Sequence, residues 1–167
     1  MFALLLAASI AADPTENMYR TAKTGDWIEW KTNDVVMRQT VTAKTDATLT
    51  LRIEQTIDGK KGPPLDQFID LKGPFPPVRK AEPKDETKTD VEELGTGKET
   101  LTVGGKTYDC TWAKRKTTIT FKGGITFVSV TKGWNCPDVP LGGAVRMETE
   151  IQGKTSVTEM TGSGRGK

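Results

Sequence analysis

The sequence predicts an all-β protein: a mainly antiparallel meander of about eight or nine strands that forms a curved sheet, half-barrel or open barrel. Two patterns carry this prediction. Apolar and polar residues alternate with a period of two in several segments, and glycine pairs separate those segments. The composition agrees, because the 26 threonines, like valine and isoleucine, carry branched Cβ atoms that suit a pleated strand. A length of 167 residues is enough for a single domain with a core and too short for two.

The first residues, 1–12, form an uncharged apolar run that ends in small residues before Asp13 and Pro14. This pattern resembles the hydrophobic and cleavage regions of a secretory signal peptide, with cleavage after Ala11 or Ala12. We therefore expect a periplasmic or secreted protein; an apolar N-terminus of another kind, or a start codon placed too late, is the alternative. The run is too short to span a membrane, which takes about 20 residues, so no transmembrane segment is expected.

In the first half of the chain, strands are expected at 27–31, 35–43 and 47–57, with a further short strand at 65–71. The segment 47–57 has the clearest alternation, because Ala47, Leu49, Leu51, Ile53 and Ile57 share one face and polar residues share the other. This pattern is typical of an antiparallel sheet with one solvated side.

The segment 73–89 is expected to be a long exposed loop. It is rich in proline and in charged residues, and neither a central strand nor a helix tolerates that number of prolines. A loop of this length inside a compact domain is either functional or merely mobile, and the sequence leaves both readings open.

The second half is expected to contain two glycine-pair hairpins, which join 98–103 to 106–113 and 117–122 to 125–134. The apolar phase changes within 125–134, which indicates either a bulge near Ser129 or burial on both faces.

Strands at 145–152 and 155–161 follow, and the single β domain is expected to cover 13–163. The glycine-rich end resembles a phosphate-binding loop but has Thr161 at the first glycine position and no helix after it, so 164–167 is expected to be a flexible tail.

Cys110 and Cys136 are the only two cysteines. In an exported protein they favour a disulfide, because two thiolates and no histidine leave zinc short of ligands; two buried free thiols are the alternative. Closing a loop of about 26 residues would stabilise the fold by roughly 3.5 kcal/mol.

The stretch 134–143 is expected to arc over the edge of the sheet, since Pro137 and Pro140 remove two backbone donors from it. This arc is either a plug that seals the core or a lip over a ligand cavity. The residues that could contact an apolar ligand, each of which could equally be core, are Trp112, Phe121, Phe127, Trp134, Val139 and Leu141.

Three segments, GDWIEW at 25–30, GKETLTVGGKTY at 97–108 and DVPLGG at 138–143, resemble a group of uncharacterised exported bacterial β-proteins. More distantly, this group is similar to the periplasmic lipoprotein-carrier superfamily, in which an antiparallel sheet curls into a half-barrel around an apolar pocket. The resemblance implies export, a half-barrel and a site for a lipid or another apolar ligand.

Composition excludes several functions. The absence of histidine removes the commonest general base and most zinc chemistry, and Asp85-Glu86 and Glu92-Glu93 read as solvated charges rather than catalytic pairs. We expect no catalysis and no metal or other cofactor. A net charge of +2 gives no reason to expect nucleic acid as a partner. The expected role is structural or interactive in the cell envelope, with an apolar small molecule or an envelope protein as the partner; the alternative is a carrier or binding module for a lipid.

Overall fold

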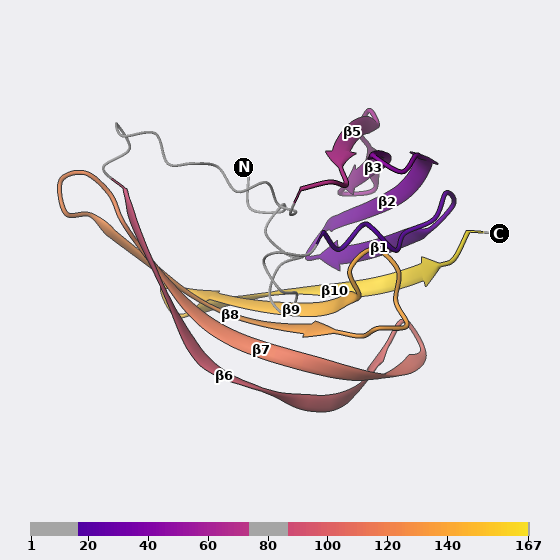
Figure 1. Ribbon diagram of the computed structural model, residues 1–167. Coiled ribbons are helices and arrows are strands. Elements are labelled where there is room, and N and C mark those ends of the chain that lie inside the picture. Colours follow the sequence, from indigo (N-terminus) through magenta and orange to yellow (C-terminus); the bar gives the residue numbers. More distant parts are fainter. Residues whose placement is uncertain (1–16, 74–86, 167) are drawn as a thin grey trace.

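The computed structural model describes residues 17–73 and 87–166. Within these residues the protein is all-β without a helix, as predicted (Figure 1). The strands are β1 (Trp27–Thr32), β2 (Val35–Lys44), β3 (Thr48–Ile57), β4 (Lys60–Lys61), β5 (Leu65–Asp70), β6 (Lys88–Val103), β7 (Lys106–Thr120), β8 (Thr126–Asn135), β9 (Ala144–Ile151) and β10 (Lys154–Gly164). The described residues therefore contain no helix that could cross a membrane.

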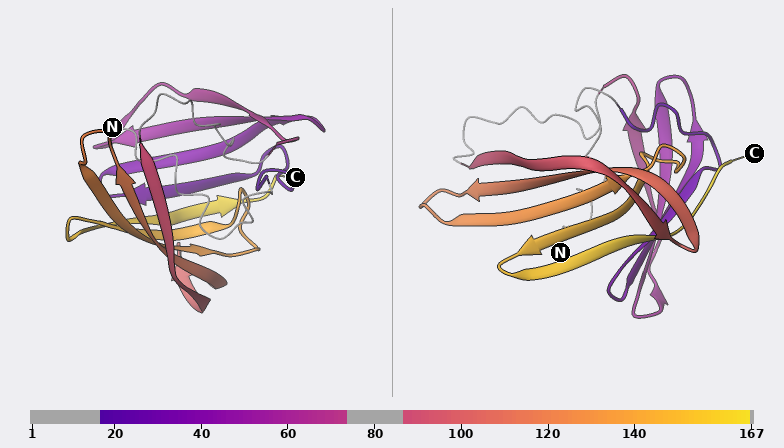
Figure 2. Two further views of the ribbon diagram at one scale, coloured as in Figure 1. Left: turned by 60° about the vertical axis from the view of Figure 1, so that its left-hand side comes forward. Right: turned by 90° about the horizontal axis from the view of Figure 1, so that it is seen from below.

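The strands form a single sheet in the order β4-β3-β2-β1-β10-β9-β8-β7-β6, and β5 also pairs with β3. Every pairing is antiparallel, and the sheet is not closed, because its path ends at β4 and β6. It consists of two meanders, β1 to β3 and β6 to β10, joined where the first strand pairs with the last. In Figures 1 and 2, β6 to β10 make a broad curved layer, and β1, β2, β3 and β5 lie to one side of it.

The core lies where these two groups of strands meet. Alternation places Leu49 and Leu51 of β3 in the core, as the sequence predicts, but Ile53 is half-buried and Ile57 is exposed. The face predicted for β3 is therefore buried only in its first half. Burying such side chains stabilises the fold by about 1.5–3 kcal/mol each. The other fully buried apolar side chains are Ile28, Val41, Ile69, Val145 and Met160.

The turn before β1 closes the core at one end, a role that its polar sequence does not suggest. Tyr19 and Ala22 are buried, and burial raises the pKa of the Tyr19 hydroxyl above its usual range. The Asn17 side-chain amide donates to the carbonyls of Asp70 and Gly73 at 2.8 and 3.0 Å, which fixes the turn to the end of β5.

Strand β7 runs unbroken through the basic residues 114–116, although the sequence predicts separate strands on either side of them. Backbone pairing with β6 and β8 continues across this stretch, and Arg115 and Lys116 contact Glu93 and Glu92 at 3.2 and 3.5 Å. The ladder on both sides keeps the strand extended, and the reading of the two glutamates as solvated charges agrees with their exposure.

Two boundaries and the position of one bulge differ from expectation. The loop predicted at 73–89 ends earlier, because β6 begins at Lys88, opposite Thr120; an edge strand with solvated faces tolerates polar residues. The register is continuous through Ser129, so a bulge there is wrong, and the shift lies between Trp134 and Asn135 instead. The tail predicted at 164–167 is bonded to the domain as far as 166, as described below. The signal peptide predicted at 1–12 lies outside the described residues.

Candidate binding surfaces

A disulfide joins β7 to the loop that follows β8. The Sγ atoms of Cys110 and Cys136 are 2.06 Å apart, the Cα atoms are 4.4 Å apart, and both residues are buried. The predicted bond is confirmed, and the alternative of two free thiols is wrong. It links β7 to the first residue after β8 within the core cluster, so it holds the loop 136–143 in place.

This loop packs against the core, and its residues also line an open pocket together with Met18, Thr21 and Arg165. Val139 and Leu141 are buried members of the core cluster, and the Cys136 amide donates to the Gly143 carbonyl at 2.8 Å to close the loop. Leu141 has a positive φ of 58°, which turns its side chain into the core at some cost in backbone strain. The burial of Val139 and Leu141 favours the plug, which stays a prediction.

Trp112 and Trp134 form the centre of a cluster on β7 and β8, in which Trp134 belongs to the core cluster and Trp112 packs against it. They pair directly across β7 and β8, and the Lys132 Nζ atom lies 4.5 and 4.3 Å from their ring centroids. Trp134 is only 4% exposed, and its indole Nε1 donates to Glu99 Oε2 at 2.8 Å. An added Cβ at Gly97 would lie 2.8 Å from the Trp112 ring, so the ring covers this glycine.

The charged side chains around this cluster form ion pairs with one another. Lys132 Nζ lies 3.3 Å from Glu99 Oε2, and Arg146 contacts Glu148 at 2.7 Å and Glu159 at 3.4 Å. The hydrogen bond from Trp134, with a smaller contribution from Lys132, lowers the pKa of the Glu99 carboxyl. Since the cations and carboxylates are paired with each other, the cluster reads as structural.

A different set of apolar side chains lies outside the core, at the free end of the β7–β8 hairpin. Ile119 pairs directly with Phe127, and the Phe121 amide donates to the Ile125 carbonyl at 2.9 Å, so these four side chains share one face. Val91 of β6 lies on the same face, opposite Thr117. Ile125 is 69% exposed, Val91 58% and Phe121 45%. We call these residues the hairpin patch: Val91, Ile119, Phe121, Ile125 and Phe127.

The hairpin patch lies on the same side of the sheet as part of the core. Counting along β8 from Phe127 in steps of two leads to Gly133, which pairs with Met147 of β9, and Met147 pairs with Thr158 of β10. Two residues further along β10 is the buried Met160. Figure 1 shows that this end of the hairpin extends away from β1 to β3, on the curved layer. The patch therefore lies on the same side of the curved layer as Met160, with the polar residues Ser129 and Thr131 of β8 between them.

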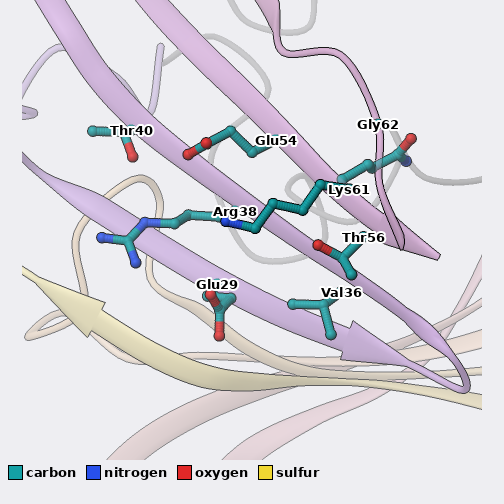
Figure 3. Close-up of a pocket in the computed structure, with 9 residues that line it drawn as sticks. Glu29, Val36, Arg38, Thr40, Glu54, Thr56, Lys61 and Gly62 are labelled. Atoms are coloured by element: carbon teal, nitrogen blue, oxygen red, sulfur yellow. The ribbon is translucent and has the colours of Figure 1, made fainter. Parts of the chain in front are cut away.

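A third surface is a shallow polar groove over β1, β2 and β3 (Figure 3). Arg38 lies in register between Glu29 and Glu54, and Lys61 lies at the edge of the groove. The Arg38 guanidinium stacks 3.9 Å from the centroid of the Trp27 ring. Two acids and two bases balance the charge of the groove, so it has no net preference for an anion or a cation.

The structure divides the predicted contact residues into three places. Phe121 and Phe127 belong to the exposed hairpin patch, Trp134, Val139 and Leu141 are buried in the core, and Trp112 packs against that core from the face of β7 opposite the patch. Val91, Ile119 and Ile125 are not among the contact residues that the sequence predicts. The signal was present in the hairpin itself, because Ile119 and Ile125 have the same parity as Phe121 and Phe127.

Comparisons with known proteins bear on the fold. No protein family and no curated protein matches the sequence. A solved structure from Parabacteroides distasonis, described as a candidate lipoprotein, has 15% sequence identity and a TM-score of 0.55; the match covers 92% of this chain and all of that one. A Bacteroides fragilis protein described as exported, with a YmcC-like fold, has 11% identity and a TM-score of 0.47 over the same shares. The first match shows a shared fold. Neither description mentions a lipoprotein carrier, so that resemblance stays a prediction.

Proposed function

We propose that this chain is an exported β-domain protein of the bacterial cell envelope that has a structural or interaction role, without catalysis, and that the hairpin patch is its contact surface. The observation that supports the proposal is the clustering of five apolar side chains on one face at the end of a hairpin, three of them at least 45% exposed. Contiguous exposed apolar surface of this kind typically marks a site of interaction with protein, lipid or ligand.

Two features support export. The disulfide between Cys110 and Cys136 belongs to an oxidising compartment, because cytosolic thiols are kept reduced. The apolar run at 1–12 has the pattern of a secretory signal. The comparison structures are described as a candidate lipoprotein and an exported protein, which agrees with this location.

Export is tested by fractionating cells after free thiols have been blocked with an alkylating reagent. The proposal expects the chain in the periplasmic or medium fraction, with a mass that shows loss of the leader and no alkylation at Cys110 or Cys136. A full-length, doubly alkylated chain in the cytosolic fraction would contradict it.

The second candidate function is a carrier or binding module for a lipid or another apolar ligand. The position of the hairpin patch favours it, because the patch lies on the same side of the curved layer as Met160 and an acyl chain lying there would bury Phe121 and Ile125. The carrier would hold a single ligand reversibly, whereas an interaction protein would hold a partner on the same side chains.

A fluorescent fatty acid and the variant Ile125→Lys separate these functions. A carrier binds the probe with one-to-one stoichiometry, retains acyl chains through native purification, and loses both in the variant. Val128→Lys is the matched control, because Val128 is exposed in β8, three residues after Ile125, and points to the opposite face. Saturable binding that the control retains and Ile125→Lys loses would establish the carrier. Absence of binding in the native protein would leave the interaction role.

A further inference from the structure

The two meanders are joined by one seam. Among the described strands, the pairing of β1 with β10 is the only one that connects β1 to β3 with β6 to β10. The seam is itself irregular, because its register shifts between Glu29 and Trp30. Features that reinforce this pairing therefore help to hold the two meanders together, in addition to the shared core and the hydrogen bond from Trp30 Nε1 to the Ala144 carbonyl at 3.1 Å.

Trp27 covers the seam on one side. It pairs with Gly164 and lies over the backbone of β10, where an added Cβ at Gly162 would lie 3.0 Å from the indole ring and one at Gly164 would collide with Trp27 Nε1. Arg38 stacks 3.9 Å from the ring centroid (the Arg38 side chain is shown in Figure 3). The indole is thus held between a guanidinium and two glycines.

Asp26 anchors the end of the seam. Its side chain is 0% exposed, and the carboxylate accepts the Lys23 amide at 2.9 Å and the Gly166 amide at 2.8 Å. Arg165 Nη1 lies 3.6 Å from the same carboxylate. Two of these three contacts come from the segment after β10, so detaching that segment would leave a buried carboxylate without its counter-charge.

Glycine at every second position makes this contact fit. Gly166 lies so close to Thr24 that an added Cβ would collide with the Thr24 carbonyl, just as Gly162 and Gly164 leave room for Trp27. Arg165, which lies between Gly164 and Gly166, also donates a hydrogen bond to the Asp138 carbonyl at 3.5 Å and so reaches the loop 136–143. The glycine-rich stretch that resembles a phosphate-binding loop in sequence therefore packs against Trp27 and Thr24.

We propose that residues 25–27 and 162–166 form a clasp, a conformational strap that keeps β1 paired with β10. Releasing the clasp opens the seam as a local unit and exposes Ile28 and Trp30 of β1, while β6 to β9 remain paired with one another. The clasp is independent of the hairpin patch, so this inference does not rest on the proposed function.

Hydrogen–deuterium exchange on the full chain tests the clasp, with Gly164→Ala and Asp26→Asn as the variants. In each variant, the amide hydrogens of β1 should exchange on the order of tenfold faster or more than in the native protein, whereas those of β7 and β8 keep their native rates. This difference is expected because proteins open in local cooperative units. Gly62→Ala is the control, because Gly62 has no positive φ and an added Cβ would lie 3.7 Å from the Gln55 carbonyl oxygen, an ordinary van der Waals contact, so it should leave all rates unchanged.

Two outcomes would overturn the clasp: unchanged exchange in β1, or a rise of the same size in β1, β7 and β8. If Gly164→Ala does not fold, Gly162→Ala replaces it, because the added Cβ there meets only the edge of the Trp27 ring at 3.0 Å. The same two criteria then apply to Gly162→Ala and Asp26→Asn.

Discussion

Trp112 and Trp134 lie directly opposite one another on β7 and β8, and the ammonium of Lys132 lies within 4.5 Å of both ring centroids. Each cation–π contact contributes about 0.5–2 kcal/mol, depending on solvent exposure. Glu99 completes the group, since it accepts a hydrogen bond from Trp134 and forms an ion pair with Lys132. The cluster therefore joins β6, β7 and β8 through side chains as well as through backbone hydrogen bonds.

Truncation of Trp134 is expected to destabilise the fold strongly. Trp134→Ala removes a side chain that is 4% exposed, and large aromatic truncations in cores cost about 3–5 kcal/mol. Urea denaturation followed by circular dichroism measures the loss. Phe121→Ala, at an exposed position, is the control and should cost less than about 1 kcal/mol. Equal losses in both variants would contradict this assignment of core and surface.

Removing the disulfide is expected to lower the free energy of unfolding by roughly 3.5 kcal/mol on the chain-entropy model. The double variant Cys110→Ser, Cys136→Ser isolates this effect from that of reductant. The intact mass of the native protein should increase by two hydrogen atoms on reduction, because each sulfur gains one. A native protein that reacts with an alkylating reagent at both positions before reduction would refute the bond.

Glu99 is expected to make stability depend on pH. Its pKa is lowered in the folded state, so its contribution is present above the pKa of the unfolded chain and is lost as pH falls through the folded-state pKa. The difference in unfolding free energy between the native protein and Glu99→Gln should therefore be present at neutral pH and shrink on acidification below the usual glutamate range. A difference that stays constant across this range would show that charge on Glu99 is irrelevant.

Gly97 is expected to be sensitive to substitution because the Trp112 ring covers it. Gly97→Ala should cost about 1–3 kcal/mol, the usual range for overpacking, although alanine lowers backbone entropy in the unfolded chain. The double variant with Trp112→Leu tests the cause, since the smaller side chain should relieve much of that cost in a double-mutant cycle. Additive effects would mean that the two residues do not interact.

The alternation in β3 and the paired glycines of the hairpins predict the fold class, because each reports local backbone geometry directly. The disulfide is predictable because only two cysteines exist. The burial of Tyr19 is not predictable from its polar neighbours, since it depends on Asn17 reaching the carbonyls of Asp70 and Gly73, more than fifty residues away in the chain.

The candidate site shows the same division. The parity of Phe121 and Phe127 places them together on one face of a hairpin. Whether that face is core or surface depends on how far the hairpin extends beyond β1 to β3, which alternation does not report. The packing role of the glycines at 162, 164 and 166 likewise depends on Trp27 and Thr24, which come from the other end of the chain.

Site-specific photo-cross-linking in living cells tests the hairpin patch most directly. A photoreactive residue at Phe121 should yield an adduct with an envelope protein or a lipid, and the mass of the adduct identifies which. The same residue at Val128, exposed on the opposite face of the hairpin, should yield none. No adduct at Phe121, or the same adducts at both positions, would contradict a role for the patch as the contact surface.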